Sequence, residues 1–401
     1  MPINLDDIRA AAERQKGVVM QTPVLPSSTF SRMSDRDIWM KAEILQRAGS
    51  FKVRGAMNAI SLLSDKQRAA GVVAASAGNH AQGVALAATT LGAQSTVYMP
   101  EGAALPKIEA TQGYGAEVRL EGANIGEAVD AAKAFAEETG ARFIHPYDDP
   151  HIIAGQGTLG LELVEQIPEP GTVVIPIGGG GLIAGTATAI KALSPETRVV
   201  GVEASATPCY VESRKAGKPV EVEVGATLAD GIRAGRPSAV AFELIEQHVD
   251  DLVTVDDGQM TEAVALLLER AKFLVEAAGA APLAAVLAGL VPESDGPTVL
   301  VLSGGNVDLL LIDHVLRHGL SSAGRYASFA VRVPDVPGQL ARVTAAIADH
   351  GANVVSVDHH REGIGLPFGY TEIRFAVETR SREMFEGLVE GLEGMGIEVL
   401  R

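Results

Sequence analysis

Short apolar runs alternate with helical patterns along most of the chain. The runs are rich in valine, isoleucine and alanine without polar alternation, which is typical of parallel strands covered on both faces. We predict strands at 37–44, 72–75, 95–99, 116–120, 141–144, 172–177, 198–202 and 298–302. Helical spacing of apolar residues predicts helices between them, among others at 79–91, 125–138, 152–167, 182–193, 261–274 and 308–318. This alternation predicts an α/β fold built on open parallel sheets.

The pattern changes after a linker of small and polar residues at 320–324. Beyond it we predict strands at 328–333, 353–358, 371–378 and 397–400 and amphipathic helices at 339–350 and 382–395. The order strand, helix, strand, strand, helix, strand is that of a ferredoxin-like βαββαβ domain. We therefore expect two domains, residues 1–320 and residues 325–401.

Composition narrows the possible functions to small-molecule chemistry. The 401 residues carry a net charge of −17, so neither nucleic acid nor a membrane surface is expected as a partner. The single cysteine, Cys209, cannot form an intrachain disulfide and fits a cytoplasmic protein, where it would be a small buried side chain. No secretory signal is visible at the start, and Glu276 and Pro282 interrupt the apolar stretch 273–291, which predicts a pair of buried helices instead of a membrane span.

One lysine has the sequence context of a reactive amine. Residues 49–63 have the spacing of an amphipathic helix, with Ser50 as the predicted N-cap and Lys52 in the first turn. The helix dipole and the nearby Arg54 would lower the pKa of Lys52, as a Schiff-base lysine requires. Taken alone, the segment fits an exposed lysine on a capped helix better.

A second candidate site is a glycine-rich loop between the strand 172–177 and the next helix, where parallel sheets bind ligands. It consists of Gly178, Gly179, Gly180, Gly181 and Leu182. Backbone N–H groups without side chains, at the start of a helix, predict a phosphate site. The alternative is the dinucleotide fingerprint of a nicotinamide-dependent oxidoreductase, in which Glu203 would bind a ribose.

Two further loops follow predicted strands and could bind ligands. The first, after the strand 72–75, consists of Ser76, Ala77, Gly78, Asn79 and His80 and could hold a carboxylate at a helix start, or be a plain turn capped by Asn79. The second begins with Ser303, whose hydroxyl could bond one ligand heteroatom without adding charge, although such turns are common. Glu276 has apolar sequence neighbours and could be a partnered core residue.

Together these segments resemble a known family. In order they are Ser50-Phe51-Lys52, the segment 76–83, the four glycines 178–181 and Ser303-Gly304-Gly305-Asn306. They resemble the threonine dehydratases (threonine ammonia-lyases) among the tryptophan-synthase-β-like pyridoxal phosphate enzymes, over roughly the first four-fifths of the chain. The resemblance implies a two-subdomain catalytic domain, with a small subdomain at about 39–147. It also implies the cofactor pyridoxal 5'-phosphate and deamination of L-threonine and L-serine to 2-oxobutanoate and pyruvate.

The resemblance also implies a role for each site residue. Lys52 would form the Schiff base with the cofactor and act as the catalytic base, and Phe51 would pack beside the ring. Asn79 would bond the phenolic oxygen of the cofactor, residues 178–182 its phosphate, and Ser303 its pyridine nitrogen. The loop 76–80 would hold the substrate carboxylate.

Serine racemase is an alternative within the same resemblance. Its pattern has a serine as a second acid–base group where this chain has Ala77, and alanine cannot carry a proton. The family's divalent-cation ligands would fall at Glu203 and near Cys209, and cysteine departs from the acidic pattern. We therefore expect no such metal.

The segment 333–340 resembles the first strand-to-helix turn of the ACT domain, an amino-acid-sensing module that usually pairs across subunits. The resemblance implies feedback by an amino-acid effector, with isoleucine inhibiting and valine opposing, in a homo-oligomer such as a dimer or tetramer. The cellular role would be isoleucine biosynthesis or threonine breakdown. The alternative is a ferredoxin-like domain used only for dimerisation.

Overall fold

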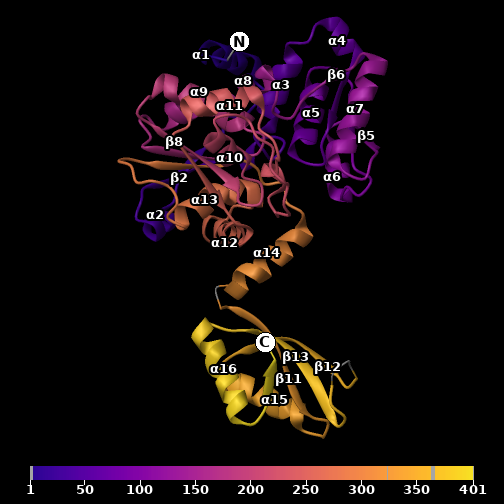
Figure 1. Cartoon of the computed structure of the whole chain (residues 1–401), viewed down its shortest axis with the longest axis vertical. Coiled ribbons are helices and arrows are strands. Elements are labelled where there is room, and N and C mark those ends of the chain that lie inside the picture. Colours follow the sequence, from indigo (N-terminus) through magenta and orange to yellow (C-terminus); the bar gives the residue numbers. More distant parts are fainter. Residues whose placement is uncertain (1–2, 323, 363–365, 401) are drawn as a thin grey trace. The chain divides into compact units, whose positions relative to one another are not determined.

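The computed structural model describes residues 3–322, 324–362 and 366–400. The chain divides into two compact units, Met1–Asp308 and Leu309–Arg401 (Figure 1). Helix α14 (Leu309–Ser322) belongs to the second unit, where it contacts β11 (Tyr326–Pro334). The linker expected at 320–324 is therefore partly wrong, because α14 continues through residues 320–322. Residue 323 lies outside the described residues.

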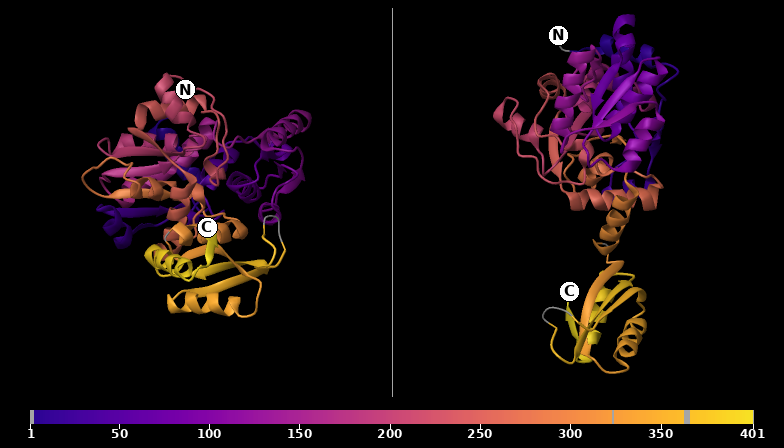
Figure 2. Two further views of the ribbon diagram at one scale, coloured as in Figure 1. Left: turned by 60° about the horizontal axis from the view of Figure 1, so that its bottom comes forward. Right: turned by 90° about the vertical axis from the view of Figure 1, so that its right-hand side faces the viewer.

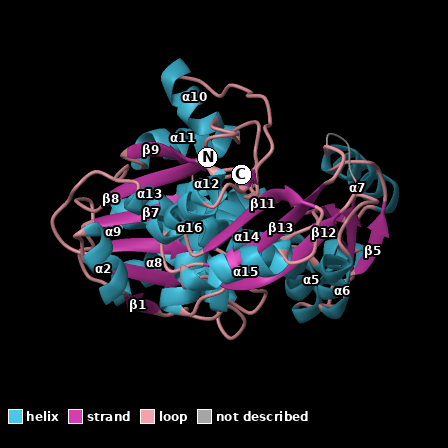
Figure 3. Ribbon diagram, turned by 90° about the horizontal axis from the view of Figure 1, so that it is seen from below, coloured by secondary structure: helices cyan, strands magenta, loops and turns pink. Residues whose placement is uncertain are grey.

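The first unit contains a six-stranded sheet with the order β1-β2-β10-β7-β8-β9. Its strands are β1 (Val24–Pro26), β2 (Ile38–Ala42), β7 (Thr172–Pro176), β8 (Arg198–Ala204), β9 (Asp251–Val255) and β10 (Thr298–Leu302). All neighbours are parallel except β1 and β2. Figure 3 shows β9, β8, β7 and β1 in this order across the sheet. The short strands β1 and β9 were not predicted.

Helices cover both faces of this sheet. On one face, α8 and α9 pack against each other and against α1, and their apolar side chains share one core with β7, β8 and β10. On the other face, α13 contacts β7, β8, β9 and β10. The helices around this sheet are α1 (Leu5–Gln15), α2 (Ser28–Ser34), α8 (Pro150–Gln166), α9 (Gly181–Leu193), α10 (Cys209–Ala216), α11 (Ala239–His248), α12 (Asp257–Leu266) and α13 (Ala277–Leu287), with the short turns η1 (Glu43–Leu45) and η2 (Asp230–Ile232).

A smaller, wholly parallel sheet has the order β5-β4-β3-β6. Its strands lie in the purple part of the chain in the right-hand view of Figure 2. It consists of β3 (Val72–Ala75), β4 (Ser95–Met99), β5 (Glu117–Leu120) and β6 (Arg142–Phe143). Its helices are α3 (Lys52–Ser61), α4 (Asp65–Ala70), α5 (Asn79–Thr90), α6 (Leu105–Gly113) and α7 (Ile125–Thr139). Because β2 pairs with β10 in the larger sheet, we place the start of the smaller part after β2 and not at Trp39.

One helix prediction in the first unit has shifted bounds, and another is wrong. The helix expected at 261–274 begins at Asp257, because Asp256 caps it, and passes through a π-helical turn, η3 (Leu267–Ala271), to Lys272 in the left-handed region. The pair of helices expected at 273–291 is the single helix α13, which contains Pro282. No helix among the described residues has the length and apolar character needed to span a bilayer.

The second unit has the predicted ferredoxin-like order. Its sheet, β12-β13-β11-β14, is antiparallel, and apolar residues of its strands form one core with α15 and α16. The elements are β11, α15 (Gln339–Asp349), β12 (Asn353–His360), β13 (Tyr370–Glu378), α16 (Arg382–Gly394) and β14 (Glu398–Leu400). Both predicted helices and all four predicted strands are confirmed to within a few residues.

A buried ion network fixes the position of α3. The Arg54 guanidinium has no exposed surface and donates to both oxygens of Glu43, at 2.7 and 2.8 Å, and of Glu162, at 2.6 and 2.9 Å. Lys41 Nζ lies 2.6 Å from Glu162 Oε2. Burial alone would raise the pKa of Glu43, but Arg54 and Lys41 outweigh it and lower that pKa. This stabilisation is therefore present above the carboxyl's unfolded pKa and is lost as the pH falls through its folded pKa.

We expect Glu43→Gln to destabilise the first unit by about 3 to 5 kcal/mol, because Arg54 then keeps a buried charge with one carboxylate fewer. Urea unfolding near neutral pH measures this loss. The matched control is Glu13→Gln, which removes an exposed pair with Lys16 and should leave the midpoint unchanged. Equal midpoints for the two variants would contradict the importance of the network.

Candidate active site

Lys52 is the first residue of α3 and lies beside the loop that follows β10. Phe51 N–H donates to the carbonyl oxygen of Ser303 at 3.1 Å, and Ser50 forms an isolated bridge with Gly304. Ser50 therefore does not cap the helix, contrary to the prediction: the N-cap position belongs to Phe51, and the buried Ser50 hydroxyl has no hydrogen bond among the described residues. The pairing with the Ser303 loop takes the place of a cap.

The Lys52 amine lies in an environment that favours its neutral form. Burial lowers the pKa of Lys52 to about 8, although the charge of Glu276 raises it. Its Nζ donates to the carbonyl oxygen of Pro146 at 3.1 Å and lies 5.1 Å from the centre of the Phe51 ring. The direction of the predicted shift is confirmed. Its largest cause is burial, and the influence expected from Arg54 is absent, because that guanidinium binds Glu43 and Glu162.

The four-glycine loop joins β7 to α9, as predicted. No acceptor among the described residues is hydrogen-bonded to the backbone N–H groups of Gly178, Gly179, Gly180 or Gly181. Gly180 has φ +86°, and a side chain at Gly179 would collide with the ring of Tyr147. Four open N–H groups at the start of a helix form a cradle for an anion.

The side chain of Tyr210 is hydrogen-bonded to this loop. Its hydroxyl donates to the carbonyl oxygen of Gly179 at 2.9 Å and accepts from Ser238 N–H at 3.2 Å. Neither Tyr210 nor Tyr147 was predicted as a site residue, since nothing in their local sequence distinguishes them from core tyrosines.

Ser303 directly follows β10 and is almost completely buried. Its hydroxyl has no hydrogen bond to another described residue. A hydroxyl without a protein partner on a buried residue is suited to bond a neutral heteroatom of a ligand.

The loop at 76–80 reaches the start of α5, but its polar side chains have separate partners. The Ser76 hydroxyl accepts from Gly78 N–H at 3.1 Å, and Gly78, not Asn79, occupies the N-cap position. His80 Nε2 lies 2.9 Å from the carbonyl oxygen of Ile144, and burial, followed by the charge of Lys52, lowers the pKa of His80 to about 3. The ring is therefore neutral near neutral pH.

The structure brings one acid into the site that the sequence left open. Glu276 is half-buried, and its Oε1 accepts from Asn79 Nδ2 at 2.7 Å. Its sequence signal, an acid directly before an alanine- and glycine-rich helix, did not distinguish a site residue from a core residue.

Glu203 does not have the free carboxylate that ribose binding requires. Its two oxygens accept from the backbone N–H groups of Tyr210, at 2.9 Å, and Val211, at 2.8 Å, at the start of α10. Cys209 is buried, as predicted. In the described parts of the chain, no group of three or more His, Cys, Asp or Glu side chains could hold a metal ion.

Comparisons with known proteins agree with this arrangement. Residues 16–304 match the family described as "Pyridoxal-phosphate dependent enzyme", and residues 328–393 match the ACT domain. The chain belongs to this family of pyridoxal-phosphate-dependent enzymes and has a C-terminal ACT domain.

Curated relatives and solved structures are similar over long stretches. An L-threonine ammonia-lyase of Geobacter sulfurreducens is 46% identical over 396 residues, covering 98% of both chains. One of Thermotoga maritima is 44% identical, covering 99% of both. The crystal structure of a T.th. threonine deaminase has 43% identity and a TM-score of 0.72, covering 77% of this chain and 99% of that one. Maize serine racemase has 37% identity and a TM-score of 0.75, covering 80% and 99%.

We expect Lys52→Ala to lose the covalently bound cofactor and its visible absorbance, since no amine then remains to form the Schiff base, while the fold is retained. Absorption spectra before and after borohydride treatment, with circular dichroism, measure both effects. Lys66→Ala is the matched control, because this lysine is exposed on α4 and should leave the spectrum unchanged. A normal cofactor band in Lys52→Ala would contradict the assignment.

Proposed function

We propose that this protein is an L-threonine ammonia-lyase that converts L-threonine to 2-oxobutanoate and ammonia, and L-serine to pyruvate and ammonia. The observation that carries the proposal is the likeness to the Geobacter sulfurreducens L-threonine ammonia-lyase over 98% of both chains, ACT domain included. The open N–H groups of the glycine loop, the amine of Lys52 and the unpaired hydroxyl of Ser303 support it, because they fit pyridoxal phosphate in charge and hydrogen bonding.

In this proposal each group binds one part of the cofactor. The N–H groups from Gly178 to Leu182 would hold the phosphate, Lys52 would form the covalent link and Phe51 would pack beside the ring. Asn79 donates to the phenolic oxygen, and Ser303 faces the pyridine nitrogen. When bound, pyridoxal phosphate supplies an electron sink for the α-carbon of an amino acid.

The residues also determine which reaction is favoured. With the substrate's amino group in its place on the cofactor, the Lys52 amine, whose pKa burial lowers to about 8, would be free to accept the α-proton of the substrate. Ser303 brings no charge to the pyridine nitrogen, which weakens the electron sink relative to an aspartate partner. Prompt loss of the β-hydroxyl is then favoured over transamination. The loop 76–80 binds the substrate carboxylate at the start of α5.

The direct test is to incubate the purified protein with L-threonine and measure 2-oxobutanoate and ammonia. We expect both products in equal amounts, and pyruvate from L-serine. D-Threonine serves as the control substrate. A protein that carries the cofactor but forms no 2-oxobutanoate would refute the proposed substrate.

Serine racemase is the second candidate, because the maize enzyme has the same fold and 37% identity. Ala77 argues against it, since no hydroxyl is present at that position. We expect Ala77→Ser to increase D-serine formation from L-serine while elimination continues, as measured by chiral chromatography. Racemisation by the unmodified protein at the rate of elimination would favour the racemase.

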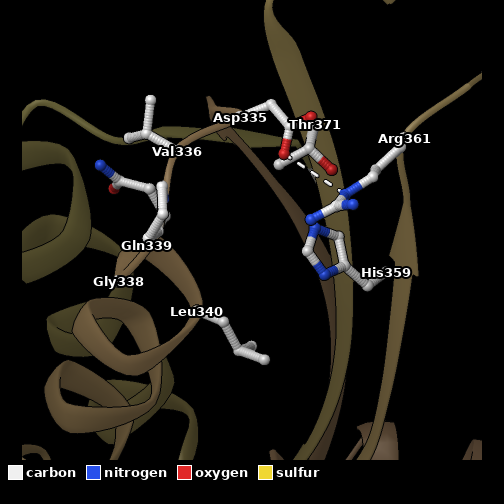
Figure 4. Close-up of a pocket in the computed structure, with 9 residues that line it drawn as sticks. Asp335, Val336, Gly338, Gln339, Leu340, His359, Arg361 and Thr371 are labelled. Atoms are coloured by element: carbon white, nitrogen blue, oxygen red, sulfur yellow. Dashed lines mark ion pairs between the residues drawn. The ribbon is translucent and has the colours of Figure 1, made fainter.

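The second unit contains a pocket of about 380 Å³ between the turn before α15 and the strand β12 (Figure 4). Gly338 and Leu340 line one side, and His359 and Arg361 line the other. The Arg361 guanidinium lies 3.3 Å from Asp335 Oδ1. We propose that an amino-acid effector binds here, with isoleucine inhibiting and valine opposing.

We also propose that the protein is a cytoplasmic homo-oligomer, a dimer or tetramer, that serves isoleucine biosynthesis or threonine breakdown. The edge strand β12 supports pairing of two ACT domains, because Val355 is 55% exposed and Val357 is 38% exposed.

We expect Arg361→Ala to raise the isoleucine concentration needed for half-inhibition by about tenfold, because a charged partner for the effector carboxylate is lost. Threonine saturation curves with and without isoleucine measure this change. Arg382→Ala, which breaks the exposed pair with Glu386 on α16, is the control. Unchanged inhibition in Arg361→Ala would place the effector elsewhere. Inhibition absent from the unmodified protein would leave dimerisation as the role of the domain.

A further inference from the structure

Glu276 lies beside the candidate active site, and none of the residue roles proposed above involves it. It precedes α13, and its backbone N–H donates to the carbonyl oxygen of Gly304 at 3.1 Å. A Cβ atom at Gly304 would lie 2.6 Å from Glu276 Oε1 and 3.0 Å from Asn79 Nδ2. The glycine therefore leaves space for a carboxyl group directly beside the loop of Ser303.

Charged groups from three other elements face this carboxyl. They are Lys52 on α3, Lys107 on α6 and Asp230 in η2. Glu276 has no ion-pair partner among the described residues. Burial therefore dominates and raises the pKa of Glu276 to about 7, although the bond from Asn79 and the charges of Lys107 and Lys52 lower it and Asp230 adds to the rise.

The bond from Asn79 is part of a chain that fixes the orientation of its amide. Asn79 Oδ1 accepts from Asn306 Nδ2 at 2.7 Å, and Asn306 Nδ2 also donates to the carbonyl oxygen of Ala48 at 2.8 Å. Both N–H groups of the Asn306 amide are thereby used. An asparagine amide has two N–H donors, and Glu276 takes only one of those of Asn79. The second N–H remains for a ligand, in an orientation set from both sides.

We propose that Glu276 is a positioning residue of the active site that also holds an exchangeable proton there. Its carboxylate keeps the free N–H of Asn79 directed at the cofactor, and its charge acts on the Lys52 amine. The inference rests on the proposed placement of pyridoxal phosphate and does not depend on the substrate. A carboxylate accepts the Asn79 bond more strongly than a carboxylic acid, so protonation of Glu276 loosens Asn79.

The test compares Glu276→Gln, which keeps the size but cannot ionise, with Glu276→Asp, which can. The visible absorbance of the holoenzyme is recorded across neutral pH. The unmodified protein should show a transition with a midpoint near 7, the Gln variant should lose it, and the Asp variant should retain it. Apoprotein of the Gln variant should also bind pyridoxal phosphate about tenfold more weakly. Glu262→Gln, exposed on the neighbouring α12, is the matched control.

Each of the following outcomes either supports or overturns the proposed role of Glu276. No transition in the unmodified protein, or an unchanged transition and unchanged affinity in Glu276→Gln, overturns the inference. If the Gln variant does not fold, as judged by circular dichroism, the Asp variant decides: a retained transition supports the role, and a lost one reduces Glu276 to a packing residue. Neither measurement uses threonine. A protein that fails to deaminate threonine but shows these spectral changes would refute the proposed function and leave this inference standing.

Discussion

The buried ion network around Arg54 is the constraint on which the site depends. Arg54 lies two residues after Lys52, and its guanidinium joins α3 to Glu43, after β2, and to Glu162 on α8. Such a network has little value as a source of stability, because removing the charges from water costs nearly as much as their attraction gains. Its effect is to allow one position for α3. The backbone of Ser50 and Phe51, directly before Lys52, is thereby held against the loop of Ser303.

Burial controls the chemistry of the groups around this helix. It shifts the pKa of Lys52 to about 8, that of Glu276 to about 7 and that of His80 to about 3, and in each case it is the largest influence. The shifts have opposite signs for the acid and the bases, because desolvation always disfavours the charged form. Burial therefore shifts the pKa of an amine and that of a carboxyl group toward neutral pH without an ion pair between the two groups.

Prediction from the sequence was correct where the signal is local. The strands before the candidate loops, the glycine turn before α9 and the βαββαβ order depend on apolar runs and turn residues, and all are present. It failed where a partner lies far away in the chain. Ser50 has the sequence context of a cap but pairs with Gly304, and the influence expected from Arg54 is absent because Glu43 and Glu162 bind it. Glu276 is hydrogen-bonded to Asn79, which lies 197 positions away in the sequence, and no local sequence pattern indicates this contact.

The strand order of the larger sheet has a consequence for synthesis of the protein. β2, which leads into the Lys52 helix, pairs with β1 on one side and with β10 on the other. A ribosome delivers β10 only after nearly the whole first unit has been made. Until then, β2 has a free edge, and the loop of Ser303 is absent from the side of Lys52. The reactive amine therefore acquires its surroundings only when synthesis of the first unit is almost complete, after a long-range strand pairing that forms late.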